Sequence, residues 1–245
     1  MDDNYDVIVV GSGPAGLGTA FHLAENSHCR ILLIDKSKIS SGGLRNDCKQ
    51  NYTFPVGFTE GLWHEDEAQK FMGQAAGHLK PEFIQQRNIA TYIKRAENLG
   101  VTLLNIRQSH VGTDKSRELI NRLTSELVKL GVTIKLETEM VSLDYEKRRV
   151  EFADSTGAGF KKLVIAPGRA GYSWLQSIMN SLNISYSDNI VDVGVRIETR
   201  EEYYPIVKDY YDPKFIFPYR VRTFCTNSGS AHIVKEKYEK YYSVN

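Results

Sequence analysis

The residues best placed to do chemistry are three glycines near the N-terminus, in the stretch VIVVGSGPAGLGTAF from Val7 to Phe21. Gly11, Gly13 and Gly16 form a G-x-G-x-x-G frame between an apolar run and an alanine-rich segment. A side chain at Gly11 or Gly13 would block a diphosphate from approaching backbone N–H groups at a helix N-terminus, and Gly16 would let the helix lie close to the strand. The turn therefore predicts a dinucleotide site.

An acidic residue that could complete this site is Asp35, at the end of the apolar run RILLID (30–35). It follows the turn by about 20 residues, the spacing at which a carboxylate accepts a hydrogen bond from a ribose hydroxyl. We therefore expect the glycines and Asp35 to hold one nucleotide. The rest of the turn and the next residue join the predicted site: Ser12, Pro14, Ala15 and Lys36.

These residues must be positioned by a strand, a helix and a second strand. The run 6–10 is rich in β-branched residues, as in strands buried on both faces of a parallel sheet. Pro14 stands where a helix begins, and we expect that helix to reach about Asn26. With the strand over 30–35, these segments form a β-α-β unit. The long segment 36–62 that follows is predicted to be a loop that is either functional or disordered.

Further elements indicate an α/β protein with a Rossmann-like parallel sheet. Helices are expected over 64–78, 83–99, 113–130 and 172–182, and short strands over 101–106 and 132–137. The runs 140–145, 149–152 and 160–165 alternate like a β-meander. Aromatic-rich strands are expected over 190–198, 216–225 and 231–235. We predict a first domain over 1–183 with a helical insertion at about 58–100, and the start of a second, sheet-containing substrate lobe over 184–245.

Composition excludes several classes of protein. The 31 basic and 30 acidic residues give a formal net charge of +1, so no bulk field attracts nucleic acid. The three cysteines, Cys29, Cys48 and Cys225, are far apart and argue against a metal site or a redox disulfide, so we expect buried or inert thiols. No run approaches the roughly 20 apolar residues of a membrane span. No export signal precedes the first strand, so the cytoplasm is the expected compartment.

Beyond the glycine turn, the chain resembles the two-dinucleotide-binding-domain flavoproteins. The form VIVVGSGPAGLGTA is similar to their FAD fingerprint. TEMVSLDYEKRRVEF resembles their T-x-V-x-x-I stretch, which implies that backbone at Met140 meets the adenine. KKLVIAPGRAG resembles their strand ending in A-T-G, with Pro167 in place of threonine, and brings Ala166 and Gly168 into the expected FAD site.

A closer resemblance covers essentially the whole chain. The segments GGLRNDCKQN, HVGTD, APGRAGYSW, VDVGVRIE and VRTFCTNSG are similar to a family described as FAD-dependent, or NAD(P)/FAD-dependent, dehydrogenases. Members are generally longer, and their additional chain returns to the FAD domain. The resemblance therefore implies an oxidoreductase or the N-terminal part of one, completed by a missing C-terminal part, a partner chain or a second copy.

The flavin end of the site is expected at the loop after Asp35. Gly42 and Gly43 would let backbone approach the cofactor, and Arg45 could bias the flavin toward its anionic reduced form. For Arg45, a solvated loop charge explains the residue equally well. The sequence does not identify a catalytic acid or base. His110 is a candidate proton donor or a strand cap. Arg196 and Arg222 are candidates for binding an anionic substrate, and they could equally form ion pairs at the surface.

The leading hypothesis is an FAD-dependent oxidoreductase that transfers hydride to or from an unidentified small molecule. The alternative is a noncatalytic nucleotide-binding subunit or fragment that needs a partner chain. A third possibility, an NAD-dependent dehydrogenase, fits the P-A-G form of the turn less well. No second glycine fingerprint is present, so a nicotinamide that donates electrons must visit the flavin without a Rossmann unit of its own.

Overall fold

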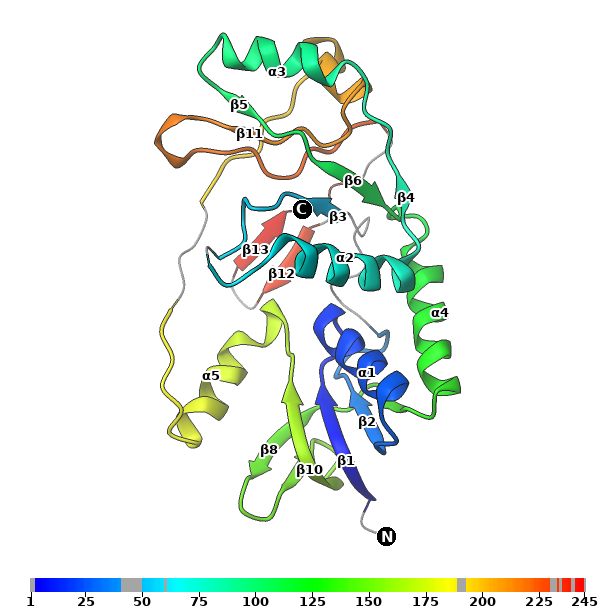
Figure 1. The fold of residues 1–245 in the computed structure, drawn as a ribbon. Coiled ribbons are helices and arrows are strands. Elements are labelled where there is room, and N and C mark those ends of the chain that lie inside the picture. The colour runs from blue at the N-terminus through cyan, green and yellow to red at the C-terminus, as the bar shows by residue number, and fades with distance from the viewer. Residues whose placement is uncertain are drawn as a thin grey trace. The chain divides into compact units, whose positions relative to one another are not determined.

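The computed structural model describes residues 3–40, 50–59, 61–188, 193–229, 233, 235–238 and 241–244 (Figure 1). The chain forms two compact units, which are described one at a time. Unit 1 comprises Met1–Arg45, Ser116–Ile190 and Tyr238–Tyr241, and unit 2 comprises Asn46–Lys115, Val191–Lys237 and Tyr242–Asn245.

Unit 1 is built on a six-stranded sheet with the strand order β7-β2-β1-β10-β9-β8. β1 pairs in parallel with both β2 and β10, and β2 pairs in parallel with β7. β9 and β8 continue the sheet in antiparallel fashion as the predicted meander. The strand bounds are β1 Asp3–Val10, β2 Ile31–Ile34, β7 Thr133–Lys135, β8 Met140–Asp144, β9 Arg149–Phe152 and β10 Gly157–Ile165. The predicted α/β fold class with a Rossmann-like parallel sheet is confirmed.

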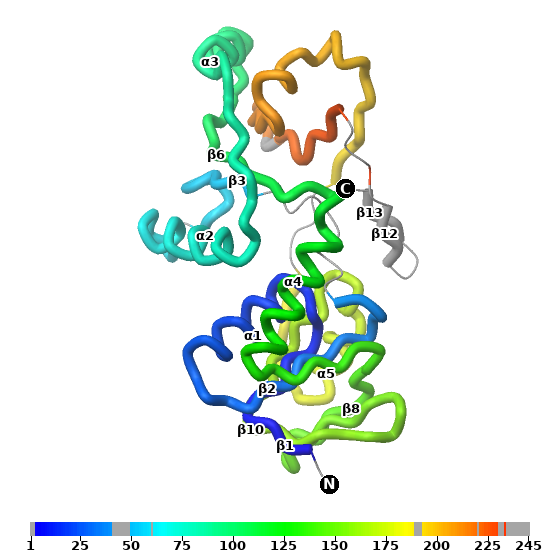
Figure 2. Tube along the Cα trace, turned by 90° about the vertical axis from the view of Figure 1, so that its right-hand side faces the viewer, coloured from blue at the N-terminus to red at the C-terminus, as the bar shows by residue number. Residues whose placement is uncertain are grey.

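Helices cover this sheet: α1 (Pro14–Asn26), α4 (Ser116–Lys129) and α5 (Tyr172–Ser181). Successive side chains of β1 lie on opposite faces of the sheet, as in any β-strand. Ile8 belongs to a buried apolar cluster with Ile178 of α5, whereas Val9 lies next to α1 at Gly16. Figures 1 and 2 both show α4 beside α1, and the two helices are in contact.

Two of the glycines allow β1, α1 and β10 to approach one another closely. A Cβ atom on Gly16 would lie 1.8 Å from the carbonyl oxygen of Gly11, and one on Gly11 would lie 2.2 Å from that of Ala166. Gly11 also has φ +100°, a value that favours glycine. Its N–H donates to Ile34 (2.8 Å), and the N–H of Ala166 donates to Val10 (2.8 Å). The predicted close contact between helix and strand at Gly16 is therefore present.

Unit 2 contains small sheets and two helices. β3 (Gln50–Tyr52) and β4 (Glu82–Phe83) flank β6 (Arg107–His110), and β5 (Thr102–Leu103) pairs with β11 (Phe215–Ile216). Its described helices are α2 (Glu65–Leu79) and α3 (Ile89–Glu97), with the short 3-10 helices η3 (Glu201–Tyr203), η4 (Pro205–Lys208) and η5 (Pro218–Arg220). A further short 3-10 helix, η2 (Arg169–Gly171), belongs to unit 1. β12 (Lys235–Tyr238) and β13 (Tyr241–Val244) form a separate two-stranded sheet.

The core of unit 2 is centred on Tyr210. Its ring is fully buried in a cluster with Leu103, Ile106 and Ile206. Its hydroxyl donates a hydrogen bond to the carbonyl oxygen of Leu104 (2.5 Å). Burial of the phenol raises the pKa of Tyr210 to about 12. The neutral hydroxyl therefore ties the segment around 210 to the chain before β6.

Several expected elements differ from the observed ones. The expected helix over 83–99 begins only at Ile89, because 82–83 pairs as β4 and Asn88 adopts a left-handed conformation (φ 54°). In the expected strand 190–198, the described residues 193–198 are not a strand. Of 216–225, only Ile216 lies in a strand, with one isolated bridge to Arg222. Within 231–235, the strand begins at Lys235.

The physical reason is the absence of partner strands among the described residues. Val193, Val195 and Ile197 alternate as a strand requires, yet they are 93%, 89% and 82% exposed. The contacts also group the expected insertion differently, because Asn46–Lys115 belongs to the same compact unit as Val191–Lys237. Whether the functional domains divide at 183 stays a prediction. None of the described helices has the length and apolar character to cross a membrane.

The contact between α1 and β1 generates a prediction for Gly16→Ala. The added methyl group would displace the backbone of Gly11, so we expect the free energy of unfolding to fall by at least about 2 kcal/mol. Gly18→Ala is the matched control in the same helix, because no atom lies within 4 Å of its Cβ position. Helix propensity should make that variant up to about 1 kcal/mol more stable. Urea unfolding measures both, and equal stabilities would contradict the close contact.

Candidate functional site

The glycine turn connects β1 to the N-terminus of α1. Pro14 is the first residue of the helix, and its first hydrogen bond runs from the N–H of Leu17 to the carbonyl oxygen of Gly13 (2.9 Å). The N–H groups of the first turn have no partner within the helix. That turn also carries no acidic residue. The end of α1 is therefore a place where backbone N–H groups and the helix dipole favour an anion.

Gly13 differs from the other two glycines of the turn. Its backbone is extended (φ −70°, ψ −178°), a conformation open to any residue. Among the described residues other than its two chain neighbours, no atom lies within 4 Å of where its Cβ would stand. Neither its backbone conformation nor its packing against the described residues requires glycine here. The open space at Gly13 fits a group that approaches the backbone from outside, as a diphosphate would.

Asp35 is bound directly to the glycine turn. Its Oδ2 accepts hydrogen bonds from the backbone N–H (2.8 Å) and the hydroxyl (2.6 Å) of Ser12. Its Oδ1 accepts a third bond from the N–H of Ser37 (2.8 Å). Ser12 is fully buried, whereas Asp35 is only half-buried. The carboxylate is thus held in place by the turn and remains partly accessible.

The ends of β10 and β7 meet the same region. Ala166 lies against Gly11, as described above, and Gly168 follows with φ +64° and open space at its Cβ position. The N–H of Thr138, in the stretch that resembles T-x-V-x-x-I, donates to the carbonyl oxygen of Asp35 (2.9 Å). Four separate parts of the sequence are therefore joined around the turn.

The remaining predicted site residues have different surroundings. Pro14, Ala15 and Lys36 are exposed. Met140 is 3% exposed and pairs with Phe152 in the meander, where its side chain belongs to the apolar core. Whether its backbone meets an adenine stays a prediction. Gly42, Gly43 and Arg45 lie outside the described residues.

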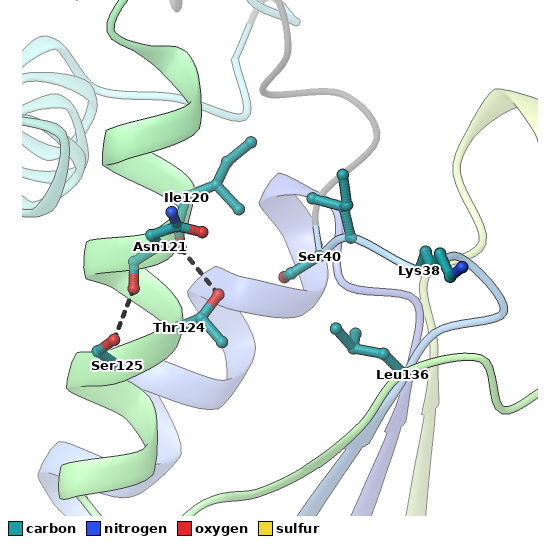
Figure 3. Close-up of a pocket in the computed structure, with 8 residues that line it drawn as sticks. Lys38, Ser40, Ile120, Asn121, Thr124, Ser125 and Leu136 are labelled. Atoms are coloured by element: carbon teal, nitrogen blue, oxygen red, sulfur yellow. Dashed lines mark hydrogen bonds between the residues drawn. The ribbon is translucent and has the colours of Figure 1, made fainter.

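A cavity of about 270 Å³ lies beside the chain that follows Asp35 (Figure 3). Lys38 and Ser40 line it from the loop, Leu136 from the end of β7, and Asn121 and Thr124 from α4. The hydroxyl of Ser40 is buried and has no hydrogen-bond partner among the described residues. The sequence analysis missed these residues, and their only signal is that Lys38 and Ser40 follow Asp35 so closely.

The catalytic candidates His110, Arg196 and Arg222 all belong to unit 2. The His110 ring lies 4.9 Å from that of Tyr211, and its Nδ1 is buried without a hydrogen-bond partner in the described part of the chain. Arg196 donates to Asn227 (3.0 Å), and the guanidinium of Arg222 lies 4.6 Å from the centre of the Phe224 ring. No acid–base pair emerges from these contacts.

Within the described ranges, no group of three or more His, Cys, Asp or Glu side chains could hold a metal ion. Cys225 is exposed and Cys29 is half-buried, so neither is a fully buried thiol. Whether the two thiols are inert stays a prediction. Cys48 lies outside the described residues.

The sheet order, the glycine turn and the acid at the end of β2 define a Rossmann-like α/β protein. A family model described as pyridine nucleotide-disulphide oxidoreductase matches residues 5–177, and the chain belongs to this family. This confirms the resemblance to the two-dinucleotide-binding-domain group. No curated protein matches the sequence.

The chain is also similar to solved structures, one of which reaches a TM-score of 0.50 and supports the same fold. Glycine oxidase from Geobacillus kaustophilus is 14% identical, with a TM-score of 0.50 over 75% of this chain and 59% of that one. Glycine oxidase from Bacillus cereus ATCC 14579 is 17% identical, with a TM-score of 0.49 over 74% and 59%. The matched part thus spans about three-fifths of these enzymes' length.

The contacts of Asp35 generate a prediction for Asp35→Ala. Removal of the carboxylate leaves the buried hydroxyl and N–H of Ser12 without their acceptor, so we expect the free energy of unfolding to fall by roughly 1–3 kcal/mol. Lys36→Ala, at the exposed neighbouring position, should change it by less than about 0.5 kcal/mol. Urea unfolding without added nucleotide measures both variants. Equal stability of Asp35→Ala and the wild type would show that these hydrogen bonds do not hold the turn.

Proposed function

We propose that this chain binds FAD through unit 1 and is an FAD-dependent oxidoreductase, or the N-terminal part of one. The single observation that carries the proposal is Gly13 at the N-terminus of α1, a glycine that neither its backbone conformation nor packing against the described residues demands. Family membership supports the reaction class. The substrate is a small molecule that no feature of the chain identifies.

In this proposal the chain's own groups bind and orient the cofactor. The first-turn N–H groups of α1 hold the diphosphate beside Gly13, and Asp35 accepts a hydrogen bond from the adenosine ribose. Ala166 and Gly168 border the same turn, and Met140 and the loop with Gly42, Gly43 and Arg45 complete the proposed site. FAD, when bound, supplies the hydride-transfer chemistry, while the protein provides orientation and electrostatics.

The proposal assigns separate roles to the two parts of the chain. The cofactor domain is assigned to 1–183 and the substrate lobe to 184–245, with a cytoplasmic location. NAD(P)H is the proposed electron donor. Because the sequence carries one glycine fingerprint, it would bind transiently at the flavin, without a Rossmann unit of its own. A partner chain, a second copy or additional chain completes the enzyme, since the relatives it matches are longer.

Gly13→Val tests the proposed binding site. The new side chain would fill the space of the diphosphate without meeting protein atoms, so we expect FAD affinity to fall at least about tenfold while the melting temperature stays unchanged. Gly18→Val is the control, because its Cβ position is equally open but lies further along α1. It should keep wild-type affinity within about twofold. Bound flavin is measured by its visible absorption, and retained affinity in Gly13→Val would contradict the site.

Steady-state oxidation of NAD(P)H by the FAD-loaded chain separates the enzyme from the noncatalytic alternative. Turnover above that of free FAD supports an oxidoreductase. Tight FAD binding without turnover, also in the presence of candidate partner chains, would favour a nucleotide-binding subunit.

A further inference from the structure

The hydrogen bonds that Asp35 accepts within the protein leave few acceptor positions for a ligand. A carboxylate offers about four acceptor positions, two on each oxygen. Ser12 donates twice to Oδ2, and Ser37 donates once to Oδ1. The described residues therefore fill both positions on Oδ2 and leave one on Oδ1. A carboxylate arranged in this way can accept one hydroxyl from a ribose, not two.

Ser12 makes two different contributions to this arrangement. Its backbone N–H would be present with any residue at this position except proline. Of its two bonds to Asp35, the hydroxyl bond is therefore the one that depends on serine. That bond is the shortest of the three at 2.6 Å, and the side chain that makes it is fully buried. A hydrogen bond from a buried hydroxyl to a charged acceptor is strong, and it holds the carboxylate in one orientation.

We propose that Ser12 is a positioning residue that restricts Asp35 to a single ribose hydroxyl of the nucleotide. The Ser12 hydroxyl occupies Oδ2 and fixes the carboxylate so that the open position of Oδ1 receives the ligand. This inference rests on the proposed function, because it requires that the adenosine half of FAD binds beside Asp35. It goes further by predicting that the two ribose hydroxyls are treated unequally.

The test compares ADP with 2′-deoxy-ADP and 3′-deoxy-ADP by calorimetry on the full chain, with FAD titrated in parallel. In the wild type, loss of one hydroxyl should weaken binding about tenfold, and loss of the other should change it by less than about twofold. In Ser12→Ala, the tenfold preference should fall to about threefold or less, because the carboxylate loses one of the three hydrogen bonds that fix its orientation. The deoxy analogue that binds about tenfold more weakly to the wild type should bind to Ser12→Ala with an affinity within about twofold of its affinity for the wild type.

Two further variants guard the result. Ser27→Ala removes the same hydroxyl at the other end of α1, where it donates to the carbonyl oxygen of Leu23, and should keep the wild-type pattern. Ser12→Cys keeps the shape of the side chain but has a much weaker donor. If Ser12→Ala does not fold, Ser12→Cys replaces it in the test, and the same fall in the preference between the two deoxy analogues is expected.

The outcomes separate the inference from the proposed function. Equal losses for both deoxy analogues in the wild type, or a tenfold preference that survives in Ser12→Ala, would overturn the role of Ser12. Equal weakening of all three ligands by Ser12→Ala would show that Ser12 only supports the turn, and would also overturn it. If the wild type binds neither ADP nor FAD, the proposed function itself fails.

Discussion

The close approach of three backbones at Gly11 is the constraint on which unit 1 depends. The carbonyl oxygen of Gly11 lies where a side chain on Gly16 would stand, and the carbonyl oxygen of Ala166 lies where a side chain on Gly11 would stand. These contacts bring the ends of β1 and β10 and the start of α1 to one place. The parallel pairing of β1 with β10 and β2 continues from there along the sheet.

Packing accounts for two of the three glycines. Gly11 and Gly16 are required by the protein's own backbone, whereas no described residue packs against the Cβ position of Gly13, at the positive end of a helix dipole. Asp35 joins this arrangement through Ser12, so the acid and the turn form one hydrogen-bonded unit. The same geometry that stabilises the sheet thus presents N–H groups and a carboxylate together, which is the pair of groups that a dinucleotide requires.

Local patterns were sufficient to predict α1 and the strands of the unit 1 sheet, but not that Asn46–Lys115 belongs to the other compact unit. The helix from Pro14 to Asn26 and the meander follow from residue type and spacing, because a proline at N1 and alternating apolar runs act within a few residues. The bond between Ser12 and Asp35 could not be predicted, because it depends on how two strands pair across 23 positions. The packing role of Gly11 was missed for the same reason, since Ala166 is far away in the sequence. In unit 2, Val193, Val195 and Ile197 have a strand pattern, but a strand also needs a neighbour, and pattern alone cannot supply one.

The most direct test of the account is a crystal structure of the chain grown with excess FAD. The account predicts the diphosphate within hydrogen-bonding distance of the first-turn N–H groups of α1, beside Gly13, and one ribose hydroxyl on Asp35. A crystal in which FAD is bound elsewhere, or in which a side chain of the protein fills the space at Gly13, would contradict it.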